Sequence, residues 1–512
     1  MLIWALTAAV LTWSIATGGG TAVGFTVDAL GQLFAIPLLV VAVWSWWVAR
    51  RRVEFDGGGQ GVGALLPVPI LLVALLVGLQ VLPAPFQIPR EGLGPTDIAG
   101  LSSSSTVPAG WPTVSVVPVA TIAAGLSLLA PLAVFIAVGC LDKAPRRSLA
   151  VLVIALGLLS LALGLLQVAQ GDGSRLRFYP YTNTTEAVGL FANRNHFSAQ
   201  LYVVLMLGGA WLADGVGRAA RSLRRGRQAP LELAGYAAFV FALLAAVALS
   251  RSRAGMALAI VAVAAIALMA RAANRSSGQG AGQQGRGGGL AVIILLGSAS
   301  LFALQFGMQR IFSRFEAALA EDLRWPLLEA TVSSFWNSLP FGTGLGSFVP
   351  VYASVESAAH VFKGYGNRAH NDLAEVLLES GLVGAALLAL FLGWFLIRAF
   401  RIWSRPIGDD RVDDLLQRAA TVVIALLLLH SLLDYPLRTT SNAVMLAFAC
   451  ALLLPAPAAP VRAARPRPAA ARRRSDPSPR LQPVMPPSPA QPWKGNVEWP
   501  EAWRGESKDG ER

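Results

Sequence analysis

The chain has 512 residues, of which 54% are hydrophobic and only 14% are charged. An ordinary soluble domain carries roughly 25% charged residues, so this chain has too few charges to cover a water-soluble globule of its length. A soluble enzyme, a disordered scaffold and a disulfide-stapled secreted module are therefore disfavoured. The net charge of +13 does not indicate a nucleic-acid partner, because no basic stretch carries a DNA- or RNA-binding pattern. An all-α polytopic membrane protein remains.

Apolar segments recur from the amino terminus to residue 455, which predicts a transmembrane domain over residues 1–455. A bilayer core of about 30 Å needs about 20 apolar residues in a helix, and on this basis we expect about twelve helices. The predicted segments are 2–17, 29–48, 62–83, 118–140, 148–168, 197–214, 231–249, 255–270, 289–306, 376–397, 419–434 and 440–455. Cys140 and Cys450 lie at the ends of such segments and offer no metal-ligand spacing, so we expect neither a metal nor a cofactor.

Lys and Arg residues orient the predicted helices, because they concentrate in cytoplasmic connections. With the amino terminus inside, the short inner connections carry most of the basic residues, such as those at 50–52 and 143–147. Two long loops then lie outside: 84–117, and 307–375 before the tenth helix. The second loop mixes apolar, aromatic and charged residues, so we expect short helices packed on the membrane face. Residues 456–512 are rich in Pro, Ala and Arg and are expected to be a disordered cytoplasmic tail.

The first polar cluster on the predicted outer side is the run Asn193, Arg194, Asn195 and His196, at the entrance to the sixth segment. Either asparagine could simply cap that helix. Capping does not explain Arg194 or His196, although a histidine here could also be an ordinary solvated loop residue. The outer position of Arg194 runs against the charge bias of membrane proteins, so it is a candidate for binding an anion.

The second cluster, with Arg251 and Arg253, lies in the tight connection between the seventh and eighth segments. These side chains could reach lipid phosphates from a membrane boundary. Alternatively, they could form an anion site at the amino end of the eighth helix, where free N–H groups and the helix dipole favour a phosphate. In that case Gly255 would permit close approach of the phosphate.

The third cluster lies in the long outer loop. It includes Arg324, the glycine-rich stretch 340–348 and the run Asn367 to Asp372, in which His370 precedes Asn371 and Asp372 as possible helix caps. The glycines follow no predicted strand, so a dinucleotide-binding interpretation fails. A lone loop histidine is usually structural, but His370 shares its loop with arginines at the outer membrane surface.

Together these clusters contain arginines, histidine and small polar residues, without a carboxylate cluster. Arginine binds phosphate in a bidentate fork, and histidine can accept a proton near neutral pH. The set suits a lipid-linked diphosphate whose leaving charge is stabilised by guanidinium groups, together with a base for an incoming hydroxyl. His430, Asp434 and Arg438, at the outer end of the eleventh segment, are further candidates. Whether they bind substrate or tie helices together stays open at this point.

The motifs Phe-Ala-Asn-Arg-Asn-His-Phe (191–197), Ser-Arg-Ala-Gly (252–255), Pro-Phe-Gly-Thr-Gly-Leu-Gly-Ser-Phe (340–348) and Ala-His-Asn-Asp (369–372) occur in this order. In this respect the chain resembles the bacterial O-antigen ligase / O-antigen polymerase superfamily of membrane glycosyltransferases. The resemblance is strongest over residues 185–395, an O-antigen ligase-like core. It implies a fold similar to that of the metal-independent lipid-sugar-dependent glycosyltransferases.

The resemblance also implies substrates, roles and a location. The donor would be a glycan on undecaprenyl diphosphate, and the acceptor a glycan or lipid A-core. Arg194, Arg253 and Arg324 would bind the diphosphate, Arg251 could share the role of Arg253, and His370 would activate the acceptor hydroxyl. The protein would be a multi-pass protein of the bacterial inner membrane with its site facing the periplasm, in contact with membrane lipids and with envelope polysaccharide assembly proteins.

Two other classes of function fit the sequence less well. Twelve helices also suit a transporter or flippase for lipid-linked glycans, but no intramembrane carboxylate chain, no paired broken helices and no internal repeat are present. A non-catalytic partner of an envelope polysaccharide machine would tolerate substitution of the outer arginines and histidine.

Overall fold

The computed structural model describes residues 1–21, 25–55, 66–83, 113–224, 230–275, 297, 324–356 and 367–457, and these residues form helices and connecting loops. Within these ranges the only β-type pairing is an isolated bridge between Pro83 and Thr113. The helices are α1 (Leu2–Thr17), α2 (Phe25–Phe55), α3 (Val68–Val81), α5 (Pro118–Ser127), α6 (Leu129–Gly139), α7 (Lys143–Gln170), α8 (Arg194–Arg224), α9 (Pro230–Leu249), α10 (Arg253–Arg275), α12 (Arg324–Asn337), α13 (Phe348–Val355), α14 (Asp372–Ser404), α15 (Arg411–Ser431), η3 (Pro436–Arg438) and α16 (Thr440–Leu452).

The all-α, polytopic prediction is confirmed. In the described part of the chain, seven stretches are long and apolar enough to cross a membrane: one within α2, α5 with α6, α7, one within α8, α9, one within α10, and α14. α1, α3 and α16 are shorter apolar helices. Every predicted segment has a counterpart helix except 289–306, almost all of which lies outside the described residues. The total of twelve therefore stays a prediction.

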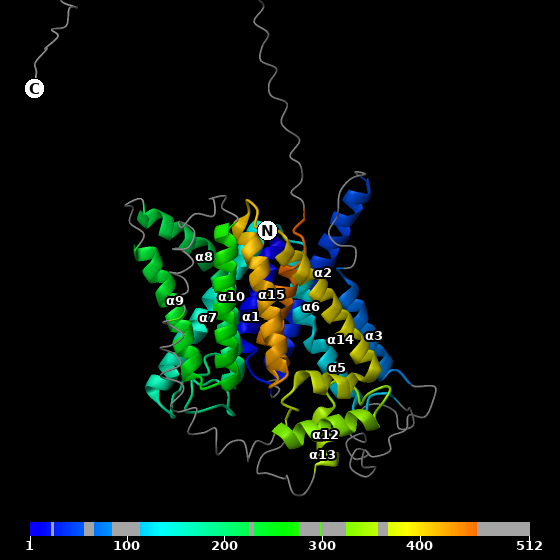
Figure 1. Ribbon diagram of the computed structural model, residues 1–512. Helices are drawn as coiled ribbons and strands as arrows, with labels where there is room; N and C mark the ends of the chain where they lie inside the picture. The colour runs from blue at the N-terminus through cyan, green and yellow to red at the C-terminus, as the bar shows by residue number, and fades with distance from the viewer. Residues whose placement is uncertain are drawn as a thin grey trace, which may run out of the picture. The chain divides into compact units, whose positions relative to one another are not determined.

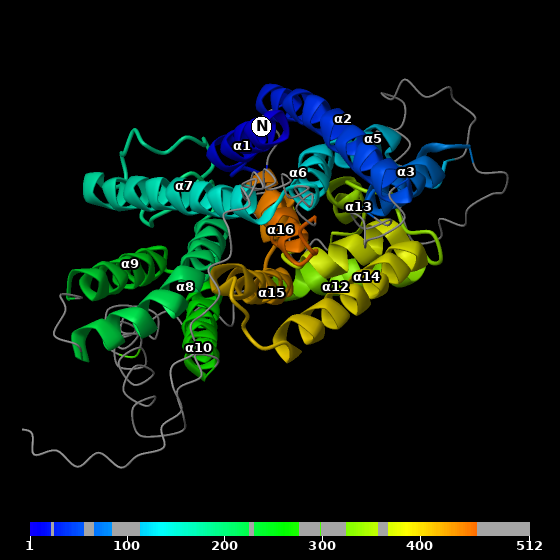
Figure 2. The same cartoon turned by 90° about the horizontal axis from the view of Figure 1, so that it is seen from above.

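Helix α8 is the centre of one half of the bundle. It packs against α7, α9, α10 and α15, as the view from above shows (Figure 2), and the membrane-length part of α8 is almost completely buried. α1 packs against α2, α6, α7 and α16. Because α8 is surrounded by other helices, its first turn is held firmly, and this turn begins at Arg194.

Charged side chains tie together the helix ends that the sequence predicts to be cytoplasmic. Lys143 pairs with Asp410, Arg147 pairs with Asp413 at 2.7 Å, and Arg411 on α15 pairs with Asp214 on α8 at 2.9 Å. These helix ends gather on one face of the bundle, with α12 and α13 at the opposite face (Figure 1). One face of the fold thus carries the ion-paired helix ends and the other carries the short loop helices, as expected. The assignment of the ion-paired face to the cytoplasm stays a prediction.

Short helices form in the long loop before α14, as expected. α12 and α13 both lie within residues 307–375, although 307–323 and 357–366 lie outside the described residues. Predictions for most of loop 84–117 and for nearly all of the tail 456–512 likewise fall outside them. In the described part, Leu327 and Phe348 help to form a small separate core under this loop.

The glycine-rich stretch 340–348 has a structural role, because it braces a break in α14. Gly381 interrupts α14 with a φ of 57°, and Leu382 N donates to Pro340 O at 2.9 Å. Gly342 has a φ of 77°, and a side-chain carbon there would lie 2.5 Å from the backbone nitrogen of Gly381. Only glycine fits such a close contact in the left-handed region. The brace fixes the first two turns of α14 and the loop that precedes them.

Candidate functional site

A buried glutamate, at the end of the bundle opposite the ion-paired helix ends, gathers three arginines. Glu186 Oε1 lies 2.7 Å from Nη1 of Arg194 and 3.8 Å from Nη1 of Arg251. Arg177 Nη1 donates to the backbone oxygens of Asn183 at 2.5 Å and Glu186 at 3.0 Å. We call Arg177, Arg194, Arg251 and the neighbouring Arg253 the arginine cluster. Two of these guanidinium groups pair with Glu186, and Asp172 is a second carboxylate near Arg177. Four arginines beside two carboxylates give the cluster a net positive charge.

Arg253 joins this cluster through helix packing. It is the exposed first residue of α10. Two residues later, a side-chain carbon on Gly255 would lie 2.2 Å from Oγ of Ser198, in the first turn of α8. The start of α10 therefore lies against the start of α8. The expectation that Gly255 admits a phosphate is wrong, because its N–H donates to Ser252 Oγ at 3.0 Å and the position is filled by α8.

A second group of residues, around His370 and Asp434, also contacts the first turn of α8. His370 Nδ1 lies 3.1 Å from Asp434 Oδ1. The Asn195 side-chain amide donates to the other oxygen of Asp434, and Tyr435 N donates to Oδ1 at 3.0 Å. A carboxylate can only accept hydrogen bonds, so Nδ1 of His370 carries a proton, and in the neutral imidazole Nε2 is then the acceptor. Asn195 follows Arg194, so the arginine cluster and His370 meet at one turn.

Asp434 remains ionised despite its burial. Burial by itself raises the pKa of Asp434, but the hydrogen bond with His370 and the neighbouring His196, His370 and Arg324 side chains together outweigh it and hold the pKa well below the usual range. Arg324 Nη1 donates to the Leu433 backbone oxygen at 3.2 Å. Arg324 therefore lies on the His370 side of the site rather than with the arginine cluster, where the resemblance predicts it.

Tyr435 separates two histidines. Its ring centroid lies 4.8 Å from those of His370 and His196, edge-on to both. Burial and the charge of Asp434 raise the pKa of Tyr435 to about 12, so its hydroxyl stays protonated. His196 is 1% exposed, so it is not a solvated loop residue. It lies buried against the ring of Tyr435.

Two left-handed residues mark the site. In the described chain, the non-glycine residues with positive φ are Arg251 at 52° and His370 at 51°. This conformation is strained for most side chains and persists where surrounding contacts impose it, often at functional sites. Both strained residues are candidates from the sequence, one on each side of the first turn of α8.

Arg438 and Asp372, secondary candidates from the sequence, belong to a buried ion cluster beside the site. Arg438 lies 3.5 Å from Asp372, 3.4 Å from Glu375 and 3.1 Å from Glu379. Burial lowers the pKa of Arg438, but the three carboxylates more than compensate and raise it. Breaking such a cluster typically costs about 3–5 kcal/mol. These groups are engaged with one another and anchor η3 to α14.

The ion cluster around Arg438 also fixes the loop that carries His370. Glu375 accepts from Arg368 Nη1 at 2.8 Å and from the backbone N–H of Ala369 at 3.0 Å. Asn371 caps α14 by accepting from Ala374 N at 2.9 Å. The residues on both sides of His370 are therefore held, and Asn371 has the capping role that the sequence allows.

His430 does not reach the site. Its Nδ1 lies 3.1 Å from the hydroxyl of Tyr202, inside the contact between α8 and α15. His430 and Asp434, which the sequence places near each other, therefore have different partners. Asp434 contacts His370, whereas His430 links α15 to α8 through Tyr202.

Comparison with known protein families adds an independent observation. The family model described as O-antigen ligase, Wzy_C, matches residues 238–389. The match supports the O-antigen ligase / O-antigen polymerase superfamily, and with it a glycosyltransferase-like, multi-pass membrane protein of polysaccharide biosynthesis. A comparison with curated proteins gave no match.

The region that the family model matches contains only part of the site. It includes Arg251, Arg253, Arg324 and His370, whereas Arg194 precedes it. The fold adds the remaining groups from outside this region, namely Arg177, Glu186, Asn195, Asp434 and Tyr435. Sequence reasoning missed Arg177, Glu186 and Tyr435. The available signals were weak: a charged residue in the loop before Arg194, and an aromatic residue directly after Asp434.

Proposed function

We propose that the protein is a membrane glycosyltransferase that transfers a glycan from an undecaprenyl diphosphate carrier to an acceptor hydroxyl. The observation that carries this proposal is that a net positive arginine cluster and an Asp434-oriented imidazole meet at the first turn of α8. The match of residues 238–389 to the O-antigen ligase family model supports the same class of reaction.

The arginine cluster is the proposed donor half of the site. A diphosphate is multiply charged, and guanidinium groups bind its oxygens in charge-assisted pairs. Glu186 holds Arg194 and Arg251 toward each other. As the sugar leaves, negative charge grows on the diphosphate, and preorganised cations stabilise this charge more than that of the intact donor.

His370 is the proposed acceptor half of the site. Asp434 holds the Nδ1–H of His370, which leaves Nε2 to take the proton of the acceptor hydroxyl. The hydroxyl oxygen then bonds to the anomeric carbon while the bond from that carbon to the diphosphate oxygen breaks. The products are a new glycosidic bond, undecaprenyl diphosphate and a protonated imidazole. Attack from the face opposite the leaving diphosphate inverts the anomeric centre.

The location follows from the charge pattern. The site lies at the end of the bundle opposite the ion-paired basic helix ends, which we assign to the cytoplasm. We therefore propose a site at the periplasmic face of the bacterial inner membrane. The acceptor is a growing glycan or the lipid A-core, and envelope polysaccharide assembly proteins would deliver or receive these substrates.

The test is glycosyl transfer by the purified full-length protein in lipid nanodiscs. We expect the reaction of an undecaprenyl diphosphate-linked glycan with acceptor to yield a glycosylated acceptor and free undecaprenyl diphosphate in equal amounts, measured by mass spectrometry. Lipid A-core and a non-reducing glycan end would be offered separately as acceptors. Movement of the intact donor across vesicles without any product from either acceptor would instead identify a flippase.

A further inference from the structure

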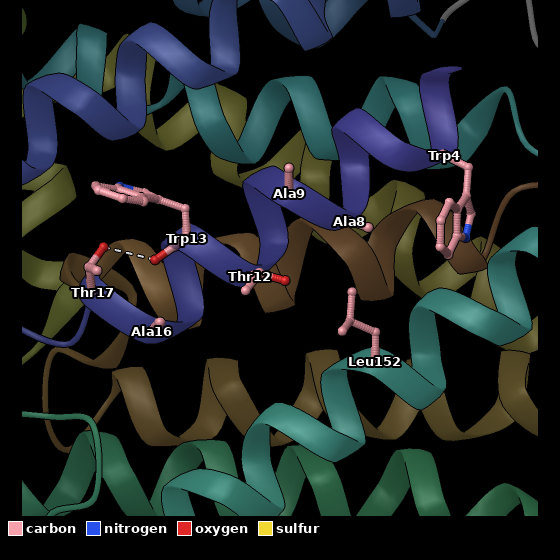
Figure 3. Close-up of a pocket in the computed structure, with 8 residues that line it drawn as sticks. All are labelled: Trp4, Ala8, Ala9, Thr12, Trp13, Ala16, Thr17 and Leu152. Atoms are coloured by element: carbon pink, nitrogen blue, oxygen red, sulfur yellow. Dashed lines mark hydrogen bonds between the residues drawn. The ribbon is translucent and has the colours of Figure 1, made fainter. Parts of the chain in front are cut away.

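An apolar groove runs along the outside of α1. It has a volume of about 580 Å³. It is lined by Trp4, Ala8, Ala9, Thr12, Trp13, Ala16, Thr17 and Leu152. Figure 3 shows the two indoles at opposite ends of the groove with Ala8, Ala9 and Thr12 between them, and with Leu152 of α7 along one side. Small side chains between two large ones leave a channel along the helix surface.

One end of this groove adjoins the arginine cluster. The hydroxyl of Tyr179 donates to Thr17 O at 3.0 Å and accepts from Gly19 N at 3.0 Å. Gly19 O accepts from Ala192 N at 3.2 Å, and Ala192 lies two residues before Arg194. The Thr17 end of the groove therefore lies near the segment that leads into Arg194.

The dimensions of the groove fit a single long hydrocarbon chain. Thirteen residues separate Trp4 from Thr17, which corresponds to about 20 Å along a helix, or most of a bilayer core of about 30 Å. A ligand that fills the groove and reaches the arginine cluster needs an anionic phosphate group at one end and one extended apolar chain at the other. A polyprenyl diphosphate has this form, whereas a phospholipid carries two chains on one headgroup.

We infer that the groove on α1 holds the polyprenyl chain of the donor while the arginine cluster holds its diphosphate. This inference rests on the proposed function and deepens it. The groove would select for carrier length, because a short prenyl chain would leave the Trp4 end empty.

A second groove offers a matched control. It is lined by Met1, Leu2, Ile3, Val40, Val41, Trp44 and Ser45, with a volume of about 450 Å³. It lies at the amino end of α1, away from Thr17, and no described contact links it to the arginine cluster. Filling it should leave donor binding unchanged.

The experiment fills each groove with phenylalanine and compares long and short donors. Ala9 and Thr12 are exposed in the α1 groove, and Val40 is exposed in the control groove, so Ala9→Phe/Thr12→Phe and Val40→Phe should fold normally. We expect the KM for an undecaprenyl diphosphate-linked glycan to rise about tenfold in the double variant. The KM for a donor with a two-isoprene chain should not change, and Val40→Phe should change neither value.

The inference would be overturned if the double variant changed the KM equally for long and short donors, or changed neither. It would also be overturned if Val40→Phe raised the KM for the long donor by the same factor. A second measurement needs no turnover: a photoreactive undecaprenyl diphosphate without glycan should label peptides of α1, and unlabelled carrier should compete. Labelling of α1 without any transfer by the wild-type protein would remove the proposed function and keep the lipid site. The proposed lipid site would be wrong if the protein transferred glycan but the probe labelled only other helices. It would also be wrong if only phospholipid, and not unlabelled carrier, displaced the probe from α1.

Discussion

Replacement of His370 by asparagine is expected to lower kcat/KM for glycosyl transfer by roughly 10²–10⁴-fold, the usual contribution of a general base. His370 has a φ of 51°, and asparagine tolerates this left-handed conformation better than most residues. The substitution therefore removes the imidazole while it preserves the loop. The measurement is the initial rate of product formation in nanodiscs, with the amount of protein in the membrane and its melting temperature unchanged.

His430→Gln is the matched control for this prediction. His430 is a buried histidine in the last turn of α15, and its ring contacts Tyr202 rather than Asp434. We expect this variant to keep most of its transfer activity, with any loss appearing in thermal stability. Wild-type rates in His370→Asn would show that the imidazole is not the base.

Replacement of Arg194 by glutamine is expected to reduce kcat by roughly 10²–10³-fold, as for the loss of a group that stabilises developing negative charge. The change removes a guanidinium group that lies 2.7 Å from Glu186. It also leaves the glutamate less compensated and so weakens the field felt by the diphosphate. The expected signature is a fall in kcat together with a rise in the KM for the donor, and no change in the KM for the acceptor.

Arg218→Gln provides the control on the same helix. Arg218 also pairs with a carboxylate, that of Asp214, but it lies near the opposite end of α8. Its loss should leave the donor KM and kcat unchanged. If Arg194→Gln altered only the acceptor KM, or if both variants lost activity equally, the donor role of the arginine cluster would be wrong.

The helices could be predicted because their signal is local. Long apolar runs identify the membrane-length and shorter apolar helices of the described chain, and the first helix occupies the predicted residues 2–17. The ends were less predictable. α8 begins at Arg194 rather than 197, because its polar first turn is stabilised by contacts with Asn183 and Glu186. The segment 118–140 divides at Leu128, because in a continuous helix the ring of Pro131 would clash with the carbonyl of Ser127, four residues earlier.

The sequence allowed us to predict which kinds of residue form the site, but not which of these residues contact each other. Asp434 and Arg438 are similar candidates in the sequence, at the same helix end. In the fold, Asp434 orients His370 while Arg438 is surrounded by Asp372, Glu375 and Glu379. The contacts that separate these roles join residues far apart in the chain, such as Asn195 and Asp434. Such pairings depend on which helices are neighbours, which periodicity and charge in one sequence do not specify.

The central claim is that one site at the first turn of α8 holds a prenyl-linked diphosphate between the arginine cluster and His370. Cryo-electron microscopy of the protein in nanodiscs with a non-transferable undecaprenyl diphosphate glycan tests this claim most directly. We predict diphosphate density against Arg194, Arg251 and Arg253, with the anomeric carbon turned toward Nε2 of His370. Diphosphate density at the opposite, ion-paired end of the bundle, beside Lys143 and Arg411, would contradict it.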